Sequence, residues 1–436
     1  MSTSLLQVSP PEIRDLEVVY RGTLQPPCRP AVPVEFHAAV PAAPDATVPT
    51  RAFLFAFLVP AMRMGTALRL PLPVDPVTLA NVMEWQEAMA SWCPRTLRVV
   101  PILADVAPAA PSANPMGAVS AFSGGIDGCF TAFRHTLAGA AVRHRRAELR
   151  AGVMVHGFDI PLTEPAAFAR AWQNSVALLR HFGLRAYRLR TNLRTLRAAF
   201  GGDWETETHG IWQAAALACF EPWFEHVLIP ATQAYPKMRF PWASNAVTDP
   251  LFSSELVTYW HDGAAFTKLA KVQALARQPL VAERVRVCWQ GEQHDRNCGV
   301  CFTCRVTQVC FWLAGVPVPA AFPRRATLAE VAQLPVKSEE HDFLVRQLHD
   351  AAVAQGQTEL AVALARASRR GVYARAVKGL KRQLTSALEP TSARQHRRSR
   401  EEVRPRPSWP IVPAVARLPA RQPAPERSAL LSPARS

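Results

Sequence analysis

Apolar and polar residues follow two different rhythms along the chain, and the change lies near residue 117. Before it, "DLEVVYRGTL" and "VPVEFHAAV" are rich in β-branched and aromatic residues and bounded by prolines, which predicts strands. The longest apolar run, residues 52–62, predicts a buried strand. A helix is expected from Pro76, because Asp75 is a good N-cap and apolar residues then recur at helical spacing.

After residue 117 the pattern predicts alternating strands and helices. "GAVSAF" reads as a strand, and "GIDGCFTAFRHTLAG" opens a helix; Gly183 is the expected end of a later one. Residues 232–262 are long and irregular, which is typical of a functional segment. Strand–helix alternation with such connections implies parallel strands in a sheet with both faces covered. Further strands are expected in "RAGVMVHGFDI", "RAYRLRTNL" and "EHVLIPAT", and further helices in "EPAAFARAWQNSVALLRHFG", "HGIWQAAALACFEPWF" and "GAAFTKLAKVQALARQ".

The chain is long enough for two or three domains, and we predict four segments. They are a small strand-rich domain (1–112), an α/β domain (113–320), a helical segment (321–388) and a tail (389–436). The tail has nine prolines and few large apolar residues, so it is expected to be disordered.

Charge is unevenly distributed. The net charge is +16, but 17 Lys and Arg against four Asp and Glu lie beyond residue 360, which leaves a nearly neutral body. A basic tail raises the possibility of nucleic-acid recruitment, although it lacks interleaved aromatic residues. No signal peptide or membrane span is expected, and an odd count of nine cysteines favours a reducing compartment, so we predict a cytoplasmic protein.

The segment "SGGIDG" after the strand "GAVSAF" carries the first candidate chemistry. The first N–H groups of a helix have no partner within it, and the helix dipole adds positive potential there. Glycines remove the side chains that would block an anion. The arrangement predicts a phosphate-binding loop, and the plain alternative is a glycine-containing turn before a helix.

This loop resembles the SGGxDS loop of the PP-loop (N-type) ATP pyrophosphatases over about 117–315. The resemblance implies a Rossmann-like fold of the adenine nucleotide alpha hydrolase type, ATP as a bound nucleotide and adenylation of a substrate with release of pyrophosphate. Asp127 would shape the loop or help to hold Mg²⁺, and Gly128 stands where the family usually has serine. The pyrophosphate end of ATP would contact Ser123, Gly124, Gly125, Asp127 and Gly128.

Weaker nucleotide candidates follow from the same resemblance and, for Gly210 and Thr232, from a place at the carboxyl ends of the strands, where such sheets bind ligands. The family reads adenine mainly with backbone groups on the next strand, here "VMVHGFDI". His156 has the alternative of an ordinary strand histidine, and the two lysines that would contact phosphate or adenylate have that of a solvated helix face. These candidates are Met154, Val155, His156, Gly210, Thr232, Lys268 and Lys271; Ser123, Asp127 and Lys271 are the expected catalytic set.

Four cysteines in C-x9-C-x2-C-x2-C spacing form the second candidate site. Two-residue gaps bring successive sulfurs to one side of a turn, and Gly299 lets the chain curl between them. We predict a structural Zn²⁺ site, with an iron–sulfur cluster as the main competitor. His294 is a less favoured substitute ligand, and Cys310 is expected in the core. The ligands are Cys288, Cys298, Cys301 and Cys304.

Within the PP-loop group, "NCGVCFTCR" with Arg305 resembles the 7-cyano-7-deazaguanine synthase-like proteins. That resemblance implies an ATP-dependent carbon–nitrogen ligase that adenylates a small carboxylate-bearing substrate before a nitrogen nucleophile attacks. The expected substrate segment is 242–263, with Ser244, Asn245 and Asp249 as pocket residues. The alternatives are a non-catalytic ATP sensor or scaffold, because of Gly128, and a nucleic-acid-associated modification protein recruited through the tail.

Overall fold

The computed structural model describes residues 2–42, 49–109, 115–137 and 145–388, with side chains up to residue 377. The chain divides into two compact units, Met1–Lys381 and Arg382–Ser436, and the strands of the described residues lie in the first. The tail predicted for 389–436 lies outside the described residues. No helix in the described part is both long and apolar enough to cross a membrane.

An 11-stranded sheet organises the first unit, in the order β11-β10-β7-β8-β9-β4-β3-β1-β5-β6, with β2 paired to β3. The strands from β11 to β9 are parallel, and β4, β3 and β1 continue the sheet antiparallel. The strands are β1 (Thr3–Val8), β2 (Glu12–Arg14), β3 (Glu17–Gln25), β4 (Val32–Ala39), β5 (Ala67–Arg69), β6 (Ile102–Leu103), β7 (Ala118–Ala121), β8 (Leu149–His156), β9 (Arg185–Thr191), β10 (His226–Pro230) and β11 (Thr258–Asp262).

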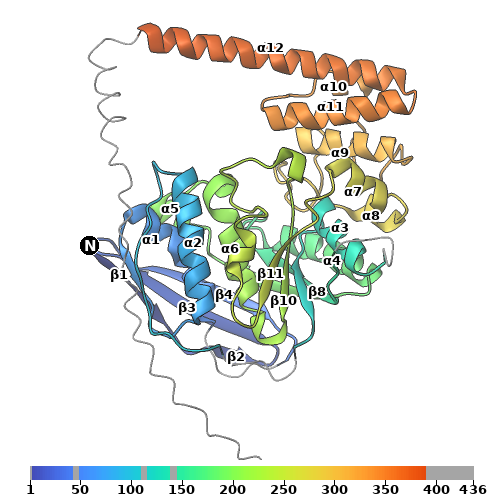
Figure 1. Cartoon of the computed structure of the whole chain (residues 1–436). Coiled ribbons are helices and arrows are strands. Elements are labelled where there is room, and N and C mark those ends of the chain that lie inside the picture. The colour runs from blue at the N-terminus through green and yellow to red at the C-terminus, as the bar shows by residue number, and fades with distance from the viewer. Residues whose placement is uncertain (1, 43–48, 110–114, 138–144, 389–436) are drawn as a thin grey trace, which may run out of the picture. The chain divides into compact units, whose positions relative to one another are not determined.

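Helices cover both faces of the parallel part, as Figure 1 shows. Neighbouring residues on one strand point to opposite cores: Val227 packs with the helices α1, α2 and α6, whereas Leu228 packs with α3, α4, α7 and α9. The predicted α/β class is therefore confirmed. The helices are α1 (Thr50–Met64), α2 (Pro76–Trp92), α3 (Ile126–His135), α4 (Pro165–His181), α5 (Thr195–Phe200), α6 (His209–Ala218), α7 (Lys268–Leu275), α8 (Pro279–Arg284), α9 (Phe302–Leu313), α10 (Leu328–Val331), α11 (Glu339–Ala354) and α12 (Thr358–Leu388).

The N-terminal segment joins this sheet through β4, whose residues Phe36–Ala38 pair with β9. The strands predicted in "DLEVVYRGTL" and "VPVEFHAAV" are confirmed as β3 and β4. The strands of residues 1–112 thus continue the sheet of the following segment, and the predicted domain boundaries stay predictions.

The buried strand predicted for residues 52–62 is wrong, because this run lies in the helix α1. A continuous apolar run fits a buried helix as well as a buried strand, and its length favours the helix. Pro60 removes one N–H from the helix, so the carbonyl of Ala56 lacks its usual donor. The indole N–H of Trp212 on α6 donates to that carbonyl at 3.2 Å, which compensates for the proline.

Other elements agree with the sequence pattern, with one omission. The strands β7, β8, β9 and β10 and the helices α3, α4, α6 and α7 stand where the alternation predicts them. The strand β11 lies inside the segment expected to be irregular. Its sequence, "TYWHD", has no clear alternation, and it is held by pairing with β10 from His226 to Pro230.

The cap of α2 gives a test of this packing. Asp75 accepts from the N–H of Thr78 at 2.9 Å and from the N–H of Glu255 at 3.2 Å. We expect Asp75→Ala to lower the free energy of unfolding by about 1–2 kcal/mol, and Asp75→Asn, which keeps an acceptor oxygen, to lower it less. Urea titration followed by tryptophan fluorescence measures both, and an unchanged midpoint for Asp75→Ala would contradict this role.

Candidate nucleotide loop and metal centre

The glycine loop lies at the carboxyl end of β7, in the middle of the parallel strands. Phe122 donates from its N–H to Val153 of β8 at 2.9 Å, which continues the sheet to the start of the loop. Ser123 is exposed, and Gly124 has a φ of +77°, a left-handed conformation that favours glycine. Gly125 caps α3 without any side-chain hydrogen bond. The loop thus turns sharply and presents its serine to solvent.

The first turn of α3 leaves backbone donors free. The first hydrogen bond of the helix runs from the N–H of Cys129 to the carbonyl of Gly125, at 3.0 Å. The N–H groups of Ile126, Asp127 and Gly128 precede it, so they have no partner within the helix. Such a group of donors, with the positive end of the helix dipole, suits a phosphate.

Gly128 is buried in this turn. A β-carbon placed there would lie 3.3 Å from Cδ2 of Phe122, so a serine would require that ring to shift by a few tenths of an ångström. The ring of Phe122 therefore packs in a position that suits glycine at residue 128 better than the family's serine.

Lys271 and Asp127, predicted from separate parts of the chain, meet beside the loop. The ammonium of Lys271 on α7 donates to Oδ1 of Asp127 at 2.7 Å and to the carbonyl of Ala231, after β10, at 2.5 Å. Lys271 is 2% exposed, whereas the Asp127 side chain is 31% exposed. The lysine charge is thus fixed at the loop, while the carboxylate stays open to solvent. Lys268, one turn earlier, is half-buried.

Arg286 is a residue at this loop that the sequence did not indicate. Its N–H donates to the carbonyl of Gly124 at 2.9 Å, and its Nη2 donates to the carbonyl of Ser123 at 3.3 Å. The residue is 7% exposed, and its Nε has no partner among the described residues. In sequence it is one charged residue in "RVRVC", a context that carries no signal of a binding role.

The end of β8 lies next to the loop. β7 ends opposite Val153, so the last three residues of β8 pair with β9 alone. The side chain of Met154 packs in a small core with Phe168. The ring of His156 stacks on Phe168 at 4.3 Å and donates from Nε2 to the carbonyl of Pro161 at 3.0 Å; burial lowers its pKa. The side chains of Met154 and His156 are packed within the protein, so backbone groups at this strand end remain available to contact an adenine base.

Gly210 and Thr232 occupy different surroundings. Gly210 is buried in the first turn of α6, and a β-carbon there would lie 1.9 Å from the carbonyl oxygen of Ala243. Only a glycine therefore lets the chain cross α6 at this point. Thr232 is exposed after β10, and its hydroxyl accepts from the indole N–H of Trp242 at 3.2 Å.

The polar residues predicted for a substrate pocket form a buried network. Asp249 accepts from the hydroxyl of Ser244 and from Nδ1 of His261, both at 2.7 Å, and from the N–H of Asn245 at 3.2 Å. Ser244, Asn245 and Asp249 are at most 4% exposed. His261, which the sequence did not indicate, is 1% exposed at its side chain, and its Nε2 has no partner among the described residues. The structure brings these residues together beneath the surface.

The four predicted cysteines meet. Their sulfurs all lie within 4.8 Å of one another, with Cys288–Cys301 at 3.8 Å and Cys298–Cys304 at 3.9 Å. A tetrahedral ion with zinc–sulfur bonds of about 2.3 Å requires sulfurs about 3.8 Å apart, so the set fits one ion. An iron–sulfur cluster spreads its cysteines over several iron atoms, so this close spacing favours a single ion.

Local geometry supports that centre. Gly299 has a φ of +75°, and a β-carbon there would lie 2.7 Å from the carbonyl oxygen of Arg324. Cys301 caps α9, and its sulfur accepts from the N–H of Cys304 at 3.4 Å. Hydrogen bonds from the thiol and N–H of Cys304 lower the pKa of Cys301 to about 5, although burial opposes the shift. The thiolate that a metal ligand requires is therefore favoured.

The two doubtful members are outside the centre. His294 pairs through Nδ1 with Glu164 at 2.8 Å. Cys310 is fully buried in α9, where burial raises the pKa of its thiol to about 12, as expected for a core residue. Arg305 pairs with Glu330 at 2.9 Å.

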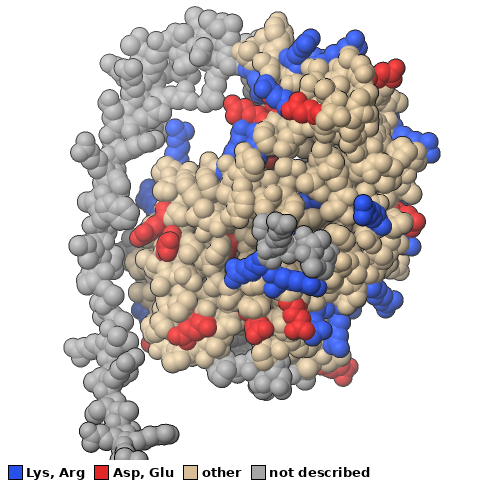
Figure 2. All heavy atoms as spheres, turned by 45° about the vertical axis from the view of Figure 1, so that its right-hand side comes forward, with Lys and Arg blue, Asp and Glu red and all other residues tan. Residues whose placement is uncertain are grey.

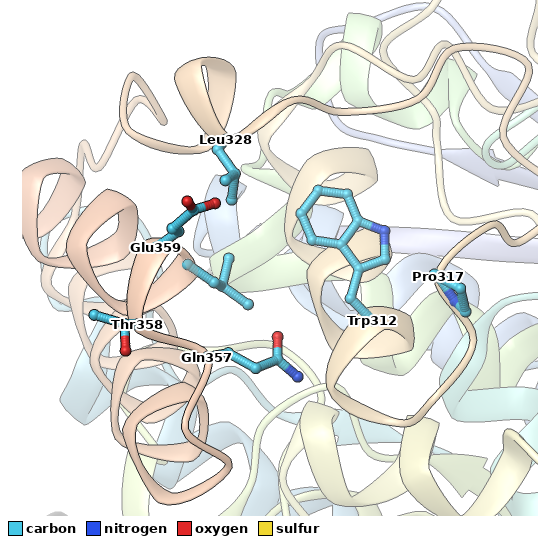
Figure 3. A pocket seen from close by; sticks show the side chains of 7 residues that line it. Trp312, Pro317, Leu328, Gln357, Thr358 and Glu359 are labelled. Atoms are coloured by element: carbon cyan, nitrogen blue, oxygen red, sulfur yellow. The ribbon is translucent and has the colours of Figure 1, made fainter.

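Other surface features are separate from these sites. A cavity of about 450 Å³ lies between the end of α9 and the start of α12, beside Trp312 and Glu359, and no predicted site residue lines it (Figure 3). Figure 2 shows basic and acidic side chains interspersed on one face, in agreement with a nearly neutral body.

Comparisons with known proteins give a partial likeness. No family model matches the chain, and no solved structure matches it. A curated relative, 7-cyano-7-deazaguanine synthase of Nitrosococcus oceani, is 33% identical over 70 residues. The match covers 14% of this chain and 31% of that synthase, so the chain spans about a third of the relative's length. The likeness relates one part of this chain to a synthase and leaves the family of the whole chain open.

The cysteine centre predicts one zinc ion per chain. We expect Cys298→Ser and Cys301→Ser to lose it, because three thiolates bind far more weakly than four, and Cys28→Ser, an exposed cysteine, to keep it. Elemental analysis of the purified protein measures the ion. If the analysis finds iron and labile sulfide, the centre holds an iron–sulfur cluster, and the interpretation as a single zinc ion is wrong.

Proposed function

We propose that this protein is an ATP-dependent ligase that adenylates a carboxylate and then joins it to a nitrogen nucleophile. The observation that carries the proposal is the loop after β7: free N–H groups at the start of α3 stand beside the ion pair of Lys271 and Asp127. The partial likeness to a synthase supports the same reading.

Phosphate binding is the task of the loop in this proposal. The N–H groups of residues 126–128 and the hydroxyl of Ser123 would bind the β- and γ-phosphates, and Lys271 would balance their charge. Asp127 has one oxygen engaged by Lys271, and its other oxygen would hold Mg²⁺, which reduces the negative charge on the phosphates. The adenine would lie against backbone groups at the end of β8.

The proposed reaction has two steps, adenylation and attack by nitrogen. A substrate carboxylate oxygen attacks the α-phosphorus, the bond to the β-phosphate oxygen breaks, and pyrophosphate leaves into the loop. A nitrogen nucleophile next attacks the acyl carbon of the adenylate, and AMP leaves with the bonding electron pair. The loop donors contribute by stabilising the charge that develops on pyrophosphate and by keeping the reactants aligned.

The buried network around Asp249 and the metal ion would stabilise the fold. Ser244, Asn245 and Asp249 satisfy one another, so we assign them to holding the segment 242–249 in place. The zinc ion would be structural, because four sulfurs occupy every position of a tetrahedral site.

A second candidate is a nucleotide sensor that binds ATP without turnover. Gly128 favours it, because the family's hydroxyl is absent and the ring of Phe122 limits the room for one. Recruitment of a nucleic acid through the basic residues beyond 360 is compatible with either function and concerns residues largely outside the described part.

Two glycines with similar positive φ angles test the phosphate loop. Gly124 has a φ of +77°, and Gly183, at the end of α4, has one of +73°. Alanine at either position imposes similar strain, but only Gly124→Ala alters the loop. We expect Gly124→Ala to weaken ATP binding about tenfold or more and Gly183→Ala to leave it unchanged, as measured by calorimetry. Equal affinities for both variants would exclude the loop as the binding site.

Substitutions at Gly128 separate the ligase from the sensor. Exchange of labelled pyrophosphate into ATP, with a panel of carboxylates, reports adenylation. Gly128→Ser adds a hydroxyl donor worth about 1.5–3 kcal/mol to a charged phosphate, so we expect exchange to rise about tenfold or more. Gly128→Ala demands the same space without the hydroxyl and should leave it near the wild-type rate. ATP binding without exchange in every variant would favour the sensor.

A further inference from the structure

A short segment connects the glycine loop to the cysteine centre. Arg286 contacts the carbonyl of Gly124 through its main-chain N–H and that of Ser123 through its guanidinium, and two residues later Cys288 contributes a sulfur to the centre. The guanidinium also donates through Nη1 to the carbonyl of Cys288 at 3.4 Å and to that of His294 at 3.2 Å. One side chain therefore binds the loop at Ser123 and two points of the segment that runs from Cys288 to Cys298.

Asn297 fixes this segment from the other side. Its Oδ1 accepts from the N–H groups of Val287 at 2.8 Å and Cys288 at 3.2 Å. Its Nδ2 donates to the carbonyls of Val285 at 2.8 Å and Ala321 at 2.9 Å. Asn297 is 2% exposed and directly precedes Cys298. The hydrogen bonds of Asn297 thus hold the backbone on both sides of Arg286, next in sequence to the metal ligands Cys288 and Cys298.

The charge of Arg286 is unusual for its surroundings. A guanidinium that is 7% exposed is costly unless it is paired, and the carboxylate with which it pairs, Asp159, lies 3.5 Å away and is 42% exposed. Its Nε has no partner in the described part of the chain. A buried positive charge behind Ser123 and Gly124 is favourable where an anion binds in front of them.

We propose that Arg286 is a positioning residue that couples metal occupancy of the cysteine centre to phosphate binding at the glycine loop. This inference rests on the proposed function, in which the loop binds ATP. When the ion leaves, Cys288 and Cys298 lose their common anchor, the segment 285–297 relaxes, and Arg286 no longer holds the two loop carbonyls. The left-handed turn at Gly124 then loses its support, and phosphate affinity falls.

Coupling of this kind is reciprocal. If the metal raises the affinity for ATP by some factor, ATP must raise the affinity for the metal by the same factor. A merely structural role of Arg286 would lower stability without linking the two affinities.

The experiment measures both affinities in the full chain. Calorimetry gives the dissociation constants of ATP and inorganic pyrophosphate for zinc-loaded protein and for protein stripped with a chelator. Equilibrium competition with a zinc indicator, with and without ATP, gives the metal affinity. The variants are Arg286→Gln, Arg286→Lys and the control Arg284→Gln, an exposed arginine two residues away that pairs with Asn174.

We expect zinc to strengthen ATP binding by about 5–150-fold in the wild type, and ATP to strengthen zinc binding equally. In zinc-loaded Arg286→Gln the ATP affinity should fall while one ion is retained, and the mutual effect should shrink, because only the main-chain bond to Gly124 remains. Arg286→Lys keeps the charge without the forked donors, so it should restore part of the affinity. Arg284→Gln should match the wild type.

The possible failures are distinct. A zinc-loaded wild type that binds neither ATP nor pyrophosphate would overturn the proposed function. A wild type that binds ATP, with Arg286→Gln retaining both its affinity and the mutual effect, would overturn the coupling alone. If the stripped protein unfolds, as judged by circular dichroism, the zinc-loaded variants still decide, because their ion remains in place.

Discussion

The hydrogen bond from the N–H of Arg286 to the carbonyl of Gly124 joins the two chemical centres of this protein. It fixes a glycine in the left-handed region at the carboxyl end of β7, and so sets the direction in which α3 begins. The sheet and the turn together therefore set the direction in which the free N–H groups of that helix point. The candidate phosphate site therefore depends on a segment more than 150 residues later in the chain.

Several buried polar groups in the loops around the sheet form hydrogen bonds within the protein. Lys271 makes two hydrogen bonds to elements far from its own in sequence, and Asn297 and Asp249 each make two or more to residues nearer in the chain. Burial of such groups is costly unless their partners are in place, so these contacts define one arrangement of the loops around the sheet. Arg286 and His261 are among the exceptions, since each retains a buried nitrogen without a partner in the described residues.

Local chemistry made several features predictable. The glycine loop, the cap at Asp75 and the cysteine spacing depend on contacts within a few residues, and the structure places each as expected. The predictions of secondary structure failed where burial on all sides hides the periodicity of apolar residues. Residues 52–62 form a helix, and β11 lies in a segment that looked irregular. The side chains of Ser244, Asn245 and Asp249 suggested a pocket because polarity does not reveal whether a residue faces solvent or another polar residue.

The sequence by itself determined the α/β alternation, the turn that precedes α3 and the four sulfurs that can meet at one ion, because these follow from backbone preferences and short spacing. Only the tertiary structure decided that Lys271 pairs with Asp127, that Arg286 lies behind the glycine loop, and that the N-terminal strands extend the same sheet. These contacts join residues far apart in the chain, and they form only when the packing of the whole sheet brings both partners together.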